Sequence, residues 1–110
     1  MKMQENQALL EILNKCAMDC HHCSTACLEE DDVSMLTKCI KLDLDCSAIC
    51  QLTAAFIARG SQNANKLLQI CAELCDACAE ECEKHEHMEH CKRCAESCRE
   101  CAKACRSAMA

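Results

Sequence analysis

The spacing of the cysteines constrains the fold of this chain more than any other feature. The chain carries 16 Cys in 110 residues, and they fall into four groups. Within each group the steps are three or four residues, except for a step of seven from Cys39 to Cys46, where Asp43 occupies the skipped position. Such an alternation is the seam of a coiled coil or helix bundle, in which every seam residue points at the shared axis. The pattern therefore predicts four helices around a core of cysteines.

Few residues interrupt these predicted helices. The chain has no Pro and one Gly, Gly60, so almost nothing breaks a helix except at its ends. We expect helices over about 4–29, 34–59, 61 or 63 to 84, and 87–109, with Ser34 as an N-cap and Gly60 at a C′ position. Connections of a few residues make neighbouring helices antiparallel. The prediction is one domain, residues 1–110: an all-α, antiparallel up-down-up-down four-helix bundle with a cysteine-lined core.

Antiparallel stacking of the four rows predicts which side chains share a layer. The expected layers, from one end, are Cys27/Cys39/Cys82/Cys91, Cys23/Asp43/Cys78/Cys94, Cys20/Cys46/Cys75/Cys98, Cys16/Cys50/Cys71/Cys101 and Leu13/Thr53/Leu68/Cys105. Leu9 and Ile57 lie beyond the last layer. We therefore expect one end closed by hydrophobic side chains and an open end lined with soft ligands.

A continuous column of thiols favours copper over other metals. Soft thiolate sulfur binds Cu(I), Zn or iron–sulfur clusters, but zinc sites are usually isolated sets of four ligands, whereas these layers repeat about every 5 Å. Each Cu(I) displaces one proton, so copper leaves less charge in a dry core than zinc at four thiolates does. The pattern predicts multiple Cu(I) ions per chain. The predicted ligands are Cys16, Cys20, Cys23, Cys27, Cys39, Cys46, Cys50, Cys71, Cys75, Cys78, Cys82, Cys91, Cys94, Cys98, Cys101 and Cys105.

Four other roles for the cysteines stay open at this point. Free Cys can fill a core as a small hydrophobic residue. The thiols could also form disulfides, hold iron–sulfur clusters, or buffer zinc in the manner of a metallothionein.

Further copper-binding side chains gather at the predicted open end: His85, His87, His90, Met35 and Met88. Imidazole and thioether both bind copper, so we expect the three histidines to be metal ligands at a port that passes Cu(I) to Cys82 or Cys91. The alternative is a solvated polar turn. His21 and His22 fall on outward positions and are expected to be surface residues.

Two features of the second predicted helix do not belong to the thiol column. Asp43 is the single acid on a core row, and it is expected to tune the second layer as a ligand or as an acceptor of hydrogen bonds from thiols, or to pair with a Lys. An apolar stripe lies off the seam, and its members are Met35, Leu42, Ile49, Leu52 and Phe56. The stripe predicts burial against another subunit, or else peripheral packing within the bundle.

Composition and charge exclude several classes of function. A Cys content this high is typical of secreted disulfide scaffolds, but Glu11 interrupts the only N-terminal apolar stretch, and thiols in rows along helices are poorly placed for disulfides. We therefore expect no signal peptide and a reducing, cytoplasmic location, where thiols tend to bind metal. No apolar run is long enough to cross a bilayer. A net charge of −6 without a basic stripe disfavours nucleic acid.

The whole pattern resembles the cysteine-rich four-helix-bundle copper storage protein family, specifically its cytosolic branch. The resemblance rests on the cysteine rows 16–27, 71–82 and 94–105, on Cys39-Ile40-Lys41-Leu42-Asp43, and on the histidine-rich segment 84–91. It implies tetramers of bundles that each load many Cu(I) ions from one mouth, and hence cytosolic copper storage and sequestration.

A metal buffer or chaperone that delivers Cu(I) or Zn to partner proteins is the alternative, although shuttles usually bind one ion on a short exposed motif. We find no nucleophile–base pair, phosphate loop or open catalytic metal site in the sequence, so we do not expect an enzyme.

Overall fold

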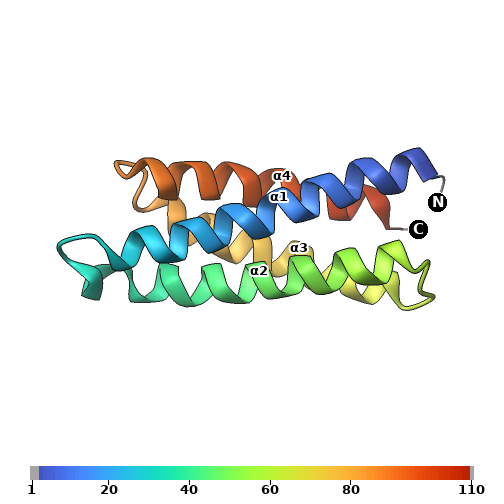
Figure 1. The fold of residues 1–110 in the computed structure, drawn as a ribbon, viewed down its shortest axis with the longest axis horizontal. Coiled ribbons are helices and arrows are strands. Elements are labelled where there is room, and N and C mark those ends of the chain that lie inside the picture. The colour runs from blue at the N-terminus through green and yellow to red at the C-terminus, as the bar shows by residue number, and fades with distance from the viewer. Residues whose placement is uncertain (1–2, 110) are drawn as a thin grey trace.

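A computed structural model describes residues 3–109 as a bundle of four long helices. They are α1 (Met3–Leu28), α2 (Thr37–Ala58), α3 (Ala64–Glu83) and α4 (Glu89–Ala108), and a short 3-10 helix, η1 (Val33–Leu36), precedes α2. Each long helix packs against two neighbours: α1 against α2 and α4, and α3 against the same two. The chain runs up and down alternately, so its two ends lie together at one end of the bundle (Figure 1). The predicted all-α four-helix bundle is confirmed.

The start of the second helix differs from the prediction. Ser34 is not an N-cap, because the chain first forms η1 and α2 begins at Thr37. The Ser34 hydroxyl instead donates to the Asp32 carboxylate at 2.6 Å, so a nearby acid takes the group that was expected to cap the helix. Gly60 does follow the C-cap of α2 with a φ of 67°, as its predicted C′ position requires.

Burial divides the bundle into a thiol column and a hydrophobic seal. All sixteen cysteines are fully buried. Leu9, Leu13, Ile57 and Leu68 are also buried, and their positions in the rows place them at the end of the core that includes Cys105. This confirms that one end of the core is closed by hydrophobic side chains.

Polar contacts on the outside hold the helices in register. Arg99 of α4 binds Glu83 and Asp76 of α3 at 2.8 and 3.2 Å, and Lys15 of α1 donates to Ser97 of α4 at 2.9 Å. Exposed pairs of this kind add little stability each, but they fix the relative height of the rows. Among residues 3–109, no helix combines the length and the apolar character that a membrane crossing requires.

Candidate metal centre

Thiols that were predicted to share a layer lie in contact. The Sγ–Sγ distances across the axis are 3.4 Å for Cys39–Cys82, 3.5 Å for Cys46–Cys75, 3.7 Å for Cys20–Cys98, 3.8 Å for Cys50–Cys71 and 3.9 Å for Cys27–Cys91. These separations are far longer than the roughly 2 Å of a disulfide bond, and all sixteen cysteines are free. These five pairs of thiols are therefore in contact, as the predicted layers require.

The layers also contact one another along the axis. Cys98 lies 3.8 Å from Cys16 in the next layer, and Cys94 lies 3.7 Å from Cys20. Contacts within and between layers are thus equally short. The thiols form a continuous column rather than a stack of separate sites.

Neighbouring candidate sites share their ligands. One group of four thiols, with Sγ atoms within 4.8 Å of one another, is Cys16, Cys46, Cys50 and Cys75; another is Cys16, Cys20, Cys46 and Cys98. Two of the sulfurs belong to both groups, so a metal in one site has a bridge to a metal in the next. Isolated tetrahedral zinc sites do not share ligands in this way, whereas Cu(I) thiolate clusters are built on bridging sulfur.

The Asp43 carboxylate replaces a thiol in the second layer and is surrounded by thiols. Its Oδ1 accepts from Cys78 at 3.1 Å, from Cys94 at 3.3 Å and from Cys82 at 3.6 Å, and its Oδ2 accepts from Cys39 at 3.9 Å. Full burial raises the pKa of Asp43 to about 8. Of the roles expected for Asp43, the structure shows one: its carboxylate accepts hydrogen bonds from thiols. No Lys is among its partners.

Burial also favours the neutral form of the thiols at the mouth. It raises the pKa of Cys27 well above its usual range. Metal binding at such a thiol must displace a proton, so the affinity for metal increases with pH.

Of the three predicted histidine ligands, only His90 reaches the thiols. Its Nδ1 lies 3.5 Å from the Sγ of Cys91, 3.6 Å from that of Cys23 and 3.8 Å from that of Cys27. Its Nε2 lies 2.8 Å from a carboxylate oxygen of Glu30. If Nε2–H donates to Glu30, the lone pair of Nδ1 faces the three thiols, which is the arrangement that carboxylates impose on metal-binding histidines. The imidazole of His90 and the thiols of Cys23, Cys27 and Cys91 also form one of the candidate metal groups.

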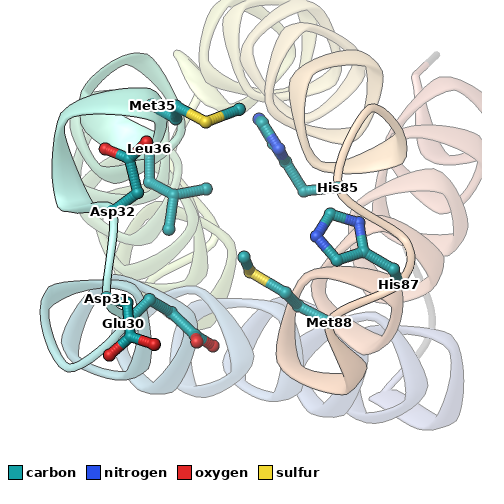
Figure 2. Close-up of a pocket in the computed structure, with 8 residues that line it drawn as sticks. All are labelled: Glu30, Asp31, Asp32, Met35, Leu36, His85, His87 and Met88. Atoms are coloured by element: carbon teal, nitrogen blue, oxygen red, sulfur yellow. The ribbon is translucent and has the colours of Figure 1, made fainter.

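The other two predicted histidines lie away from the thiol column. His85 is buried and its Nε2 lies 3.2 Å from Glu81, whereas His87 is exposed. Both line a cavity of about 300 Å³ at this end of the bundle (Figure 2). The remaining lining residues are Glu30, Asp31, Asp32, Met35, Leu36 and Met88. His21 and His22 are exposed on α1, as expected.

Two contributors to this end of the bundle were missed in the sequence. Glu30 binds His90, and Glu81 binds His85. In the sequence, the acidic run around Glu30 indicated only where a helix ends. Leu36, three residues before Cys39 on the core row, is buried as that row predicts. An apolar side chain therefore lies beside the soft ligands expected at this end.

Comparisons with known proteins agree with this geometry. A family model described as copper storage protein matches residues 2–110. A relative from Bacillus subtilis (strain 168), described as an uncharacterized cysteine-rich protein, YhjQ, is 40% identical over 92 residues, which cover 84% of each chain.

Two solved structures have nearly the same fold. The Cu(I)-bound copper storage protein BsCsp3 superimposes with a TM-score of 0.91 at 39% identity, covering 96% of this chain and 99% of the other. A cytosolic copper storage protein from Streptomyces lividans, with five coppers, gives a TM-score of 0.91 at 41% identity, over 94% of this chain and 91% of the other. With its column of contacting thiols and a family match over nearly its whole length, this chain belongs to the copper storage protein family.

Proposed function

We propose that this protein stores multiple Cu(I) ions on its core thiolates in the cytoplasm, and that copper enters at the end of the bundle that carries His90. The observation that carries the proposal is the column of buried thiols whose neighbouring groups share sulfurs. The Streptomyces lividans relative, described as cytosolic and holding five coppers, supports both the metal and the compartment. The role is binding, and we propose no catalytic activity.

The charge of the core favours a monovalent metal. Among residues 6–109, no Lys or Arg is buried, and Asp43 is the one acid in the column. Replacing each thiol proton by Cu(I) leaves the core nearly neutral, whereas four thiolates around Zn²⁺ leave two negative charges at every site. Without a buried cation to offset that charge, the bundle selects Cu(I).

Storage also fits the burial of the ligands better than delivery does. A chaperone hands its ion to a partner through thiols that the partner can contact. Here all sixteen thiols are fully buried, so a partner protein cannot reach them unless the bundle opens. The alternative of a Cu(I) or Zn chaperone predicts fast exchange with other proteins, and slow exchange supports storage.

The position of His90 supports loading from its end. The opposite end is sealed by Leu13 and Leu68. The His90 side chain is 12% exposed, and it contacts buried thiols of both α1 and α4. An imidazole in contact with both solvent and thiols is placed to bind Cu(I) first and to pass it on.

The loading route is tested by comparing His90→Ala with His87→Ala under anaerobic conditions. Stopped-flow mixing with a coloured Cu(I) donor complex measures the rate. We expect His90→Ala to slow loading while the final Cu(I) content stays close to that of wild type, because the cysteines are unchanged. His87→Ala, which removes an exposed histidine of the same end, should load at nearly the wild-type rate. Equal rates in wild type and His90→Ala would show that copper does not pass this histidine.

We also propose that the chain forms a homo-oligomer, a tetramer by resemblance to its family, through the face between α2 and α3. Leu52 and Ile70 on this face are 47% and 44% exposed, and a shallow hollow between the helices is lined by Ile49, Leu52 and Leu74. Contiguous exposed apolar side chains usually mark an interface. Met35 does not contribute, because it lines the cavity at the mouth (Figure 2).

A further inference from the structure

Leu36 closes the end of the thiol column that the sequence suggested was open. It is the last residue of η1, it lies three residues before Cys39 on the core row of α2, and it is only 1% exposed. The spacing places its side chain one layer above Cys39 on the bundle axis. A fully buried leucine at this position excludes water from the layer below it.

The layer below Leu36 holds thiols that copper must pass to reach the centre. Cys39 and Cys82 lie 3.4 Å apart, and both contact Asp43 in the next layer. The neighbouring corner of the mouth, between α1 and α4, is occupied by His90. The two halves of the mouth therefore differ: a ligand, His90, lies over one half, and an apolar side chain with no affinity for copper lies over the other.

The segment that carries Leu36 packs against two of the four long helices. Within the described residues, the backbone of η1 packs against α1 and α2 and does not approach α3 or α4. No side-chain hydrogen bond caps the N-terminus of η1, and the hydrogen bonds around it are local: Met35 N–H donates to Asp32 O at 3.3 Å and the Thr37 hydroxyl donates to Ser34 O at 3.2 Å. Such a short 3-10 segment is weakly held compared with the long helices around it.

Space for movement lies directly beside this segment. Leu36 and Met88 point into the cavity of about 300 Å³ from opposite sides, Leu36 from η1 and Met88 from the α3–α4 turn (Figure 2). His85 and His87 line the same space. The Leu36 side chain can therefore leave its buried position without displacing a helix.

We propose that Leu36 is a gate over the Cys39–Cys82 half of the column. His90 binds the entering Cu(I), and Leu36 controls its passage into and out of the Cys39–Cys82 half. When η1 holds Leu36 in place this passage is closed, and when η1 moves Cu(I) passes in either direction; the number of stored ions is unchanged. This inference rests on the proposed storage function.

The test compares Leu36→Ala with Leu13→Ala, which removes an equally buried leucine at the sealed end. Loading is followed by stopped-flow with a Cu(I) donor complex, and release is followed by adding a high-affinity Cu(I) chelator to the loaded protein. We expect Leu36→Ala to load and to release copper about tenfold faster than wild type, a change that corresponds to a barrier lower by about 1.4 kcal/mol. Leu13→Ala should keep wild-type rates, because the cavity that it creates is not on the copper path.

Three outcomes overturn the gate. Unchanged rates in Leu36→Ala show that Leu36 does not obstruct copper. Equal acceleration in both variants shows that general loosening of the bundle, not gating, controls the rates. If Leu36→Ala does not fold, Leu36→Val and Leu36→Phe replace it. The gate is then refuted if Leu36→Phe, with the larger side chain, does not load and release Cu(I) more slowly than wild type. Failure of storage itself is a separate result, because it lowers the Cu(I) content of the wild-type protein.

Discussion

Replacing Asp43 by Asn should remove most of a pH dependence that the structure builds into the apo bundle. Burial raises the pKa of this carboxyl from 3.8 to about 8, so the folded state binds its proton more tightly than the unfolded chain does. The corresponding stability is fully present below about pH 4 and is lost as the pH rises towards 8. Each pH unit in that window lowers the free energy of unfolding by about 1.4 kcal/mol, so the total loss of stability approaches roughly 6 kcal/mol. An amide at position 43 keeps an oxygen acceptor for the thiols but carries no proton to lose.

Chemical denaturation of the metal-free, reduced protein at several pH values between 4.5 and 7.5 measures this effect. The free thiols of the unfolded chain stay mostly protonated in that range, and every other group is common to both proteins, so its contribution cancels in the difference. We expect the free energy of unfolding of Asp43→Asn, relative to wild type, to increase by about 1 kcal/mol or more per pH unit. Parallel pH profiles of the two proteins would refute the assignment of the raised pKa to Asp43.

Two more predictions follow from the thiol core and from the outer face. Loading with Cu(I) should raise the melting temperature by more than about 15 °C, because only the folded bundle presents the sites; an unchanged melting curve would place the metal on the surface. Leu52→Glu should dissociate the oligomer without changing the Cu(I) content per chain, whereas Met18→Glu, at a similarly exposed residue of α1, should leave it assembled. Sedimentation velocity decides this, and an intact oligomer in Leu52→Glu would contradict an α2–α3 interface.

The core was predictable from the sequence because a single periodicity determines it. A helix brings residues three and four apart onto one face, so the row from Cys71 to Cys82 had to face the axis. Short connections then set the heights of the rows, and the predicted pairing of Cys46 with Cys75 was confirmed at 3.5 Å. Asp43 followed the same rule, since it occupies the position that Cys39 and Cys46 leave between them.

The side-chain positions at the mouth were less predictable, because the helices end there and the spacing of residues no longer determines which way a side chain points. His85 lies three residues after Cys82 and follows the inward face of α3 into a contact with Glu81, which the sequence could not indicate because it depends on side-chain rotamers. His90 immediately precedes Cys91 and is off the axis by phase, yet its ring turns to the thiols, and its partner Glu30 comes from a loop sixty residues earlier. The 3-10 turn at Leu36 depends on local contacts of Asp32 and Ser34 that compete with helix capping.

The central claim is that the thiol column stores copper as a polynuclear array. The most direct test is an anaerobic titration of the fully reduced protein with Cu(I), in which Cu(I)-thiolate luminescence and elemental analysis report the number of bound ions. The structure predicts roughly one Cu(I) per cysteine, because neighbouring sites in the middle of the column share sulfurs. Saturation below about eight ions per chain, towards the four that sixteen thiols in separate tetrahedral sites would hold, would contradict storage in a shared column.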